Sequence, residues 1–298
     1  MATARQLANQ PEVGALAPTS PGRLRVGTAA LVLPASLFLL ITFVYPVGLL
    51  LLRSVSFPTW GIQNYTTIFQ ETIYLRVLAN TVAISGAVTL ITLLLGYPYA
   101  YLMATGSPVT QRVMAFVVLV PFWTSILVRT YAWLVLLQRR GLVNRALEWS
   151  GLITEPLDLV HNRIGVYIGM TQILLPFMVF PLFAVMSRID RNHLQAAANL
   201  GAPPTRVFIR IFLPLSLPGV IAGVLLVFIL SLGYFITPAL LGGPGDIMIA
   251  QLIQEQIGEF GEWGVGAALA AVLLIGTVLL AALLNRFIKL DRIWGGQS

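Results

Sequence analysis

The sequence predicts an all-α membrane protein with six transmembrane helices. Of its 298 residues 57% are apolar and only 10% are charged, and the mean hydropathy is +0.86. Long apolar runs alternate with short polar segments, which is typical of multispanning membrane proteins. The chain has no cysteine, so disulfides and cysteine nucleophiles are excluded. Its two histidines, His161 and His193, lie far apart in the sequence, and we expect no metal site.

The membrane domain is expected at residues 27–290, between two cytoplasmic tails. Residues 1–26 are polar and small, which indicates a mobile tail, and residues 291–298 form a second, shorter one. The first crossing is predicted at residues 28–52, a run too long for a cleaved signal peptide. Residues 53–77 mix polar and aromatic side chains and suit the outer membrane interface.

The second crossing is predicted at residues 78–104, with a tight return at residues 105–111. The third begins near Arg112 and contains Pro121 and Arg129 among aromatic residues. Arg129 either faces a solute cavity or reaches toward the interface from a helix break. We favour the second interpretation, because aromatic neighbours mark interfacial depth.

The segment between the third and fourth crossings, residues 138–163, is polar. Residues 141–149 within it fit a short amphipathic helix on the outer surface. The remaining crossings are predicted at residues 164–186, from residue 207 or 208 to 230, and at 264–287. Residues 231–246, SLGYFITPALLGGPGD, are too rich in Gly and Pro for a plain helix. A broken element at membrane depth must line a cavity or be buried in protein, so we expect the solute pathway here.

The distribution of charge predicts that both termini lie in the cytoplasm. Glu255, Glu259 and Glu262 have a spacing that would place them on one helical face, outside the membrane. Eleven Lys and Arg residues fall on the predicted inner side, which fits the positive-inside rule: Arg5, Arg23, Arg25, Arg112, Arg188, Arg191, Arg206, Arg210, Arg286, Lys289 and Arg292. Four arginines in the outer segment at residues 138–163 do not fit this pattern.

Between the fourth and fifth crossings lies a polar segment, HLQAAANLGAPPTRVFIRIFLPLSLP, at residues 193–218. Three alanines favour a short helix, Gly201 tolerates the left-handed conformation that ends one, and Pro203 and Pro204 prevent its continuation. The segment is therefore expected to be a short helix, a turn and a re-entry into the membrane. By itself this pattern also suits an ordinary interhelical linker.

The residues of this segment resemble the EAA loop of permeases of ABC importers. That pattern has Glu-Ala-Ala, three residues, Gly-Ala, and a later Ile-x-Leu-Pro. The positions that match this pattern are Gln195, Ala196, Ala197, Gly201, Ala202, Ile211, Leu213 and Pro214. Leu200 belongs to the same loop, and Phe208 stands where the family usually has an aromatic residue. The resemblance implies the type I permease fold and a coupling helix, within residues 188–214, that sits in a groove of a cytoplasmic ATPase. Gln195 stands where the family commonly has Glu, which removes a charge from that contact.

Three further stretches are similar to the first permease of spermidine/putrescine-type importers. They are LVRTYAWLVLLQRRGLVNRAL at 127–147, SLGYFITPALLGGP at 231–244 and EWGVGAALAAVLL at 262–274. Many relatives have Gly-Asp-Phe where this chain has Gly233, Tyr234 and Phe235, so a carboxylate is absent. An aromatic ring still attracts a cation, by about 0.5–2 kcal/mol. The candidates for the substrate pathway are Tyr131, Trp133, Tyr234, Phe235 and Thr237; packing between helices would explain each of them equally well.

The resemblance implies a permease subunit in a bacterial inner membrane, not an enzyme. Its partners would be a second, related permease, two cytoplasmic ATPase subunits and an external solute-binding protein. The chain lacks a G-x-x-x-x-G-K-[ST] motif, so ATP and Mg²⁺ would be used by the ATPase subunits. We expect a polyamine or related organic cation as the solute; an amino-acid derivative, an opine or an iron-type substrate is the alternative. A stand-alone secondary transporter would need more ionisable residues inside its helices, and no catalytic constellation supports an intramembrane enzyme.

Overall fold

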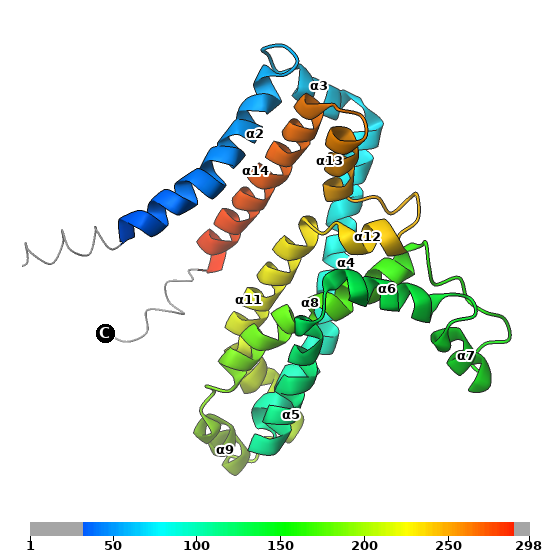
Figure 1. Ribbon diagram of the computed structural model, residues 1–298. Coiled ribbons are helices and arrows are strands. Elements are labelled where there is room, and N and C mark those ends of the chain that lie inside the picture. The colour runs from blue at the N-terminus through cyan, green and yellow to red at the C-terminus, as the bar shows by residue number, and fades with distance from the viewer. Residues whose placement is uncertain (1–31, 289–298) are drawn as a thin grey trace, which may run out of the picture. The chain divides into compact units, whose positions relative to one another are not determined.

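The computed structural model describes residues 32–288, and all regular structure in that part of the chain is helical (Figure 1). The two predicted tails lie outside the described residues, as do several of the charges used to predict orientation. The chain divides into two compact units after Leu50. The described part of the first unit belongs to one apolar helical span, Val32–Ser56, which includes η1 (Leu40–Val44) and α2 (Tyr45–Ser56).

Proline explains two short π-helical turns. The Tyr45 amide bonds to the Leu40 carbonyl at the end of η1, and Pro46 follows directly. The Leu213 amide bonds to the Phe208 carbonyl at the end of η3 (Phe208–Phe212), and Pro214 follows directly. Proline has no amide hydrogen and its ring clashes with the carbonyl four residues earlier. A wider turn before each proline lets the helix continue past it.

The second crossing begins earlier than predicted. A short helix, α3 (Gln63–Gln70), is followed by α4 (Thr72–Thr105), so α4 starts at Thr72 and not at Leu78. At a rise of about 1.5 Å per residue, the 34 residues of α4 extend about 51 Å, which exceeds the hydrocarbon thickness of a bilayer. The N-terminal part of α4 therefore belongs to the segment that composition alone had placed at the interface.

The third crossing, predicted to begin near Arg112 and to contain Pro121, begins at Pro108 and is sharply bent. Helix α5 (Pro108–Leu119) continues into the 3₁₀ turn η2 (Val120–Trp123). The segment Ile126–Trp149, which begins with α6 (Ile126–Leu137), then runs at 99° to this first part. Pro121 marks the break, since proline cannot donate the hydrogen bond that would continue the helix. After α6, the predicted amphipathic helix is present as α7 (Leu142–Trp149).

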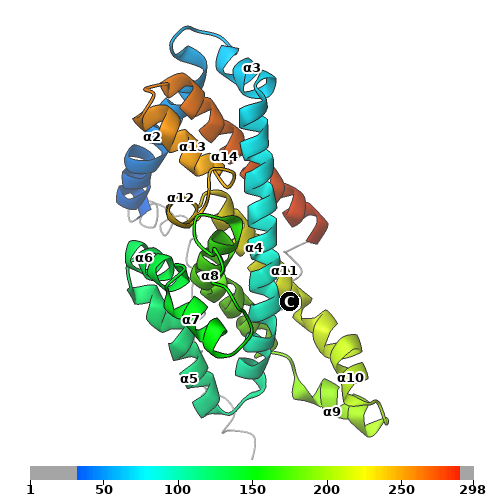
Figure 2. The same ribbon diagram turned by 90° about the vertical axis from the view of Figure 1, so that its right-hand side faces the viewer.

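Helices α4, α8 (Arg163–Met186) and α11 (Leu213–Leu232) form the core of the second unit and run side by side in Figures 1 and 2. Met178 of α8 is fully buried at their centre. A Cβ added to Gly96 of α4 would lie 2.9 Å from Cγ of Met178, and one added to Gly223 of α11 would lie 2.7 Å from Sδ of Met178. Small residues thus let the three helices approach closely, as is common in membrane bundles.

The region between α11 and the last crossing is broken, as predicted. It contains the short α12 (Ile236–Leu241) between irregular segments, and then α13 (Ile249–Gly258) and α14 (Trp263–Ile288). The prediction that Glu255, Glu259 and Glu262 share one helical face was wrong, because α13 ends at Gly258 and Gly261 has a φ of +69°. The described part of the chain has five helices able to cross a membrane, and six if the bent pair α5 and α6 counts as one.

Candidate functional site

The predicted coupling segment folds as a separate short helix, α9 (Arg191–Asn199), between α8 and α10 (Pro204–Val207). Asp190 caps its start, because its carboxylate accepts the Asn192 amide at 2.9 Å. Gly201 ends it with a φ of +82°, and the Ala202 amide bonds back to the Ala197 carbonyl at 3.1 Å. This is the left-handed helix end that glycine makes without strain. Pro204 then starts the next helix, where its missing amide hydrogen costs nothing.

One face of this segment is open. Gln195, Ala196 and Gly201 are exposed, and Leu200 is 88% exposed although it is apolar. A Cβ at Gly201 would meet no atom within 4 Å. Ala197 and Ala202 are half-buried and face the rest of the protein. The segment therefore presents small side chains and one unpaired leucine on a surface that a partner can approach closely.

An aromatic cluster connects this segment to the membrane core. The Phe208 ring is 5.5 Å from the Tyr101 ring, 6.2 Å from the Tyr97 ring and 5.8 Å from the Phe212 ring, measured between centroids. Phe212 lies edge-on to Tyr101 at 5.0 Å. The Tyr97 hydroxyl also lies 2.9 Å from the Ser216 hydroxyl, so α4 is joined to both η3 and α11. Leu213 is half-buried at the end of this cluster, and Pro214 is exposed.

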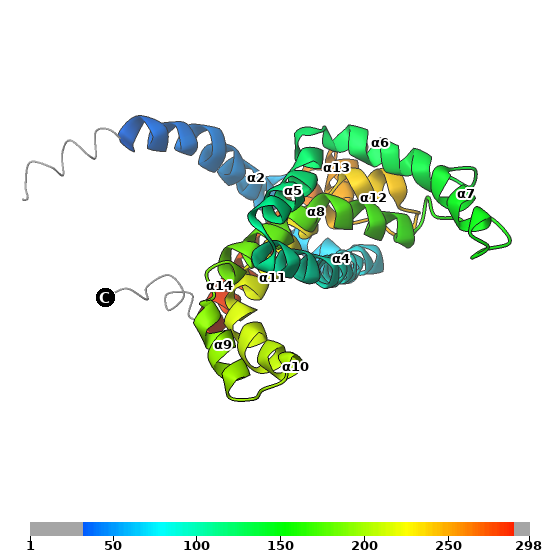
Figure 3. The ribbon, with the colours of Figure 1, turned by 90° about the horizontal axis from the view of Figure 1, so that it is seen from below.

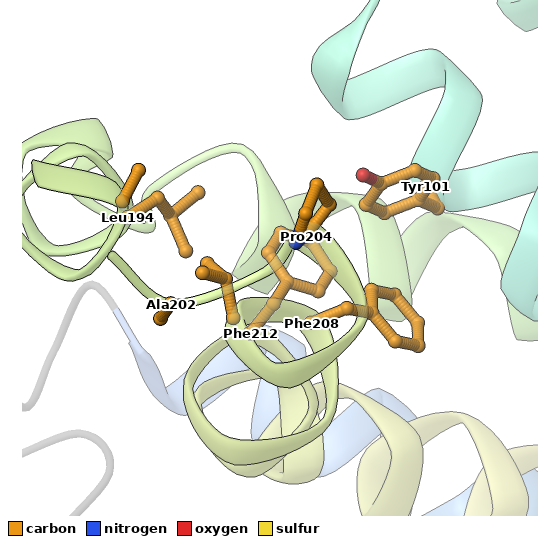
Figure 4. A pocket seen from close by; sticks show the side chains of 8 residues that line it. Tyr101, Leu194, Ala202, Pro204, Phe208 and Phe212 are labelled. Carbon is orange, nitrogen blue, oxygen red and sulfur yellow. The ribbon is translucent and has the colours of Figure 1, made fainter. Parts of the chain in front are cut away.

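A hollow of about 240 Å³ lies between α9 and this cluster (Figure 4). It is bounded by residues from α4, α9, α10 and η3: Tyr101, Leu194, Ala198, Ala202, Pro204, Val207, Phe208 and Phe212. Figure 3 shows α9 and α10 as two short adjacent helices joined by the turn at Gly201. The hollow separates them in part from α4, and Phe208 and Phe212 contact Tyr101 beside it.

The predicted pathway residues do not all come together. Thr237 of α12 is fully buried, and its hydroxyl lies 3.3 Å from that of Thr130 of α6. Trp133, one turn further along α6, donates to the Gln172 side chain of α8 at 3.3 Å. Tyr131 is 54% exposed and Phe235 is also exposed. Thr237 and Trp133 thus lie at packed contacts around α12 and α8, whereas Tyr131 faces outward.

Two polar groups near this contact lack hydrogen-bond partners. The Tyr234 hydroxyl is enclosed without one, and so are Nε and Nη1 of Arg129, within the part of the chain that the structure describes. A guanidinium that reached out to the interface would keep its nitrogens accessible. The structure therefore favours the other interpretation of Arg129, in which it faces the interior beside the broken element.

A polar cluster that no local sequence pattern indicated holds the end of the broken element. Arg163, the first residue of α8, donates from Nε to the Asp246 carboxylate at 2.8 Å and from Nη2 to the Asn80 side-chain oxygen at 2.5 Å. The Asn80 amide group donates to the Ile247 carbonyl at 2.9 Å. Asp246 is nearly buried and also accepts the Gly243 amide at 3.1 Å. Arg163 and Asp246 are 83 residues apart, so no local pattern could have paired them.

Glycines in α8 let α12 pack against it. A Cβ on Gly169 would lie 2.7 Å from side-chain atoms of both Leu241 and Thr237. A Cβ on Gly165 would lie 2.6 Å from the Leu159 carbonyl oxygen. Asn162 caps α8 by accepting the Ile164 and Gly165 amides at 2.9 and 3.0 Å. The broken element is therefore fixed at the end near Asp246 and closely packed against α8.

The chain is similar to characterised permease components. It is 36% identical over 232 residues to the spermidine/putrescine transport system permease protein PotB of Haemophilus influenzae, which covers 78% of this chain and 80% of the relative. It is 36% identical over 237 residues to PotB of Escherichia coli, with 77% and 86% covered. The inner membrane ABC transporter permease protein YdcU of Escherichia coli is 32% identical over 250 residues, with 79% of each covered.

The fold is also that of a solved transporter. A chain of a bacterial alginate ABC transporter, in complex with an alginate pentasaccharide-bound periplasmic protein, matches with a TM-score of 0.70. The match covers 93% of this chain and 97% of that one at 18% sequence identity, so it shows the fold alone. It is the type I permease fold expected from the sequence. Residues 24–290 match the model of one family, and the chain belongs to the binding-protein-dependent transport system inner membrane components, which are multi-pass permease subunits of ABC transporters and not enzymes.

Proposed function

We propose that this chain is a permease subunit of an ATP-driven importer of polyamines or related organic cations. The observation that carries the proposal is the open coupling helix α9, which has exposed small residues and Leu200 on one face and the aromatic cluster behind it. The substrate class comes from the PotB relatives, which are 36% identical over more than three quarters of this chain. Both termini and α9 lie in the cytoplasm.

The chain works with four further subunits. A second, related permease lines the path with it, two cytoplasmic ATPase subunits bind ATP and Mg²⁺, and an external binding protein delivers the solute. The α9 surface suits a groove in the ATPase, because small side chains allow close approach and Leu200 offers an apolar anchor. Since Gln195 replaces the usual Glu, this contact relies on shape and neutral hydrogen bonds.

The mechanism follows from the contacts that join the α9 segment, through η3, to α4. When the ATPase subunits close, they push on α9, and Phe208 and Phe212 transmit the movement to Tyr101 and Tyr97 of α4. Packed side chains shift between discrete arrangements and do not deform continuously, so α4, α8 and α11 move together. This movement alternates access to α12, where Tyr234 and Phe235 offer ring faces to an organic cation.

Reconstitution tests the proposal. The five-subunit complex in liposomes, with ATP inside and radiolabelled spermidine outside, is expected to accumulate spermidine only when the binding protein and ATP are both present. Replacing the external solute with an amino acid or an iron chelate tests the alternative solutes. Accumulation that continues without ATP, or that follows a proton gradient, would show a secondary transporter instead.

A further inference from the structure

The outer helix α7 carries an apolar stripe that no described residue covers. Leu142 is 66% exposed, Trp149 is 91% exposed and Ala146 between them is also exposed. Their spacing of four and three residues places them on one face of the helix. Asn144 on the opposite face is fully buried. Helix α7 is therefore held firmly from one side and open on the other.

The buried side is fixed by specific hydrogen bonds. The Asn144 side chain donates to the carbonyls of Gln138 and Leu157 at 3.1 and 2.9 Å, and it accepts the Leu157 amide at 2.8 Å. Arg139, just before α7, pairs with Asp158 at 3.3 Å. These contacts tie α7 to the segment that leads directly into Arg163, the first residue of α8. The outward direction of the stripe is thus a consequence of how α7 is attached.

Helix lengths place this attachment at a membrane boundary. The 24 residues of α8 extend about 36 Å, and from Asn80 to Thr105 helix α4 rises about 38 Å. Both distances slightly exceed the hydrocarbon thickness of about 30 Å. The hydrogen bond between Arg163 and Asn80 puts the start of α8 and this part of α4 at one level. That level is the boundary opposite to α9, and α7 is tied through Asn144 and Arg139 to the segment that leads into it.

Composition and charge indicate what covers the stripe. Helix α6, which leads into α7 (Figure 3), also exposes apolar side chains, namely Val128, Tyr131 and Val135. Two of the four arginines that did not fit the charge pattern are paired, Arg139 with Asp158 and Arg163 with Asp246. The other two, Arg140 and Arg145, are exposed and form no ion pair among residues 32–288.

We infer that α7 is an interfacial anchor, whose Leu142–Ala146–Trp149 stripe lies in the lipid leaflet opposite to α9, with Arg140 and Arg145 at the headgroup phosphates. A helix with an apolar stripe, a tryptophan and flanking arginines is suited to lie in this layer. The anchor holds the α6–α8 connection, and with it the outer end of the broken element, at constant depth. The inference rests on the membrane insertion of the chain and not on the proposed substrate.

Site-directed spin labelling tests the anchor, since a chain without cysteine accepts single labels cleanly. Leu142→Cys and Trp149→Cys are labelled in the assembled complex, in nanodiscs of phosphatidylethanolamine and phosphatidylglycerol. We expect the ratio of oxygen to nickel-chelate accessibility at both positions to be several-fold higher than at Glu148→Cys, an exposed position on the same helix. Addition of the binding protein should leave this ratio unchanged.

Two results would overturn the inference. One is a preference for the nickel chelate at positions 142 and 149, which would place the stripe in water. The other is shielding from both reagents that depends on the binding protein, which would make the stripe a protein-docking surface. If a label disturbs folding, quenching of tryptophan fluorescence by brominated lipid replaces it as the test. The quenched fraction should be smaller in Trp149→Phe than in the unmodified chain. An unchanged quenched fraction would also overturn the inference. None of these measurements requires transport, so failure of the proposed function would leave their outcome unaffected.

Discussion

Replacing Phe208 with alanine should uncouple ATP hydrolysis from transport. Phe208 lies half-buried in η3 and has three aromatic neighbours within 6.2 Å. Truncation of a fully buried Phe costs about 3–5 kcal/mol, and each aromatic pair contributes about 0.5–1.5 kcal/mol beyond area burial. Because the Phe208 ring is only half-buried, we expect Phe208→Ala to weaken the free energy of interaction between η3 and α4 by about 2–4 kcal/mol. Phe208→Leu keeps most of the volume and should lose about 1–2 kcal/mol.

The assay measures ATP hydrolysed per solute molecule imported by the reconstituted complex. If the aromatic cluster transmits the movement of α9, this ratio rises several-fold in Phe208→Ala, is intermediate in Phe208→Leu, and the midpoint of thermal inactivation falls. Ile209→Ala is the matched control, because Ile209 is the next residue, also apolar, and 60% exposed. An unchanged ratio in Phe208→Ala, or an equal rise in Ile209→Ala, would refute the reasoning.

Three further predictions concern helix packing, the Arg163–Asp246 pair and the charge at position 195. Gly219→Ala should destabilise the chain by about 1–3 kcal/mol in thermal inactivation, since its Cβ would lie 3.1 Å from the Pro181 carbonyl oxygen; Gly276→Ala, with no atom within 4 Å, should not. A double-mutant cycle with Arg163→Gln and Asp246→Asn should give a coupling energy of about 1–2 kcal/mol, discounted because Arg163 is 44% exposed, and independence of the two changes would contradict the ion pair. Gln195→Glu should make binding of the ATPase more sensitive to salt, and identical salt curves for both forms would show that this position does not meet a basic group.

Local signals in the sequence predicted most of the helices and the coupling segment. Apolar runs found the spans, and α8 was placed within one residue of its observed start. Gly201 between an alanine-rich helix and two prolines predicted the turn that its positive φ confirms. These features depend on residues next to one another, so one sequence is sufficient to find them.

Features that depend on distant contacts were missed or wrong. Pro121 signals a break, but the 99° bend depends on how α6 packs against α8 and α12. The Arg163–Asp246 pair and the hydrogen bonds of Asn144 to Leu157 join segments that no local pattern connects. The acidic face proposed for Glu255, Glu259 and Glu262 failed because spacing alone did not reveal the helix end at Gly258.

Cross-linking from α9 tests the central claim most directly. Leu200→Cys gives a single, 88% exposed thiol on the coupling segment without disturbing buried contacts. A short-reach photoactivatable label there should cross-link to the ATPase subunit in the assembled complex, with a yield that changes on addition of ATP. The same label at Glu148, an exposed position on α7, should give no ATPase adduct. Absence of an ATPase adduct at position 200, or an equal yield from both positions, would contradict the claim that α9 couples this permease to ATP hydrolysis.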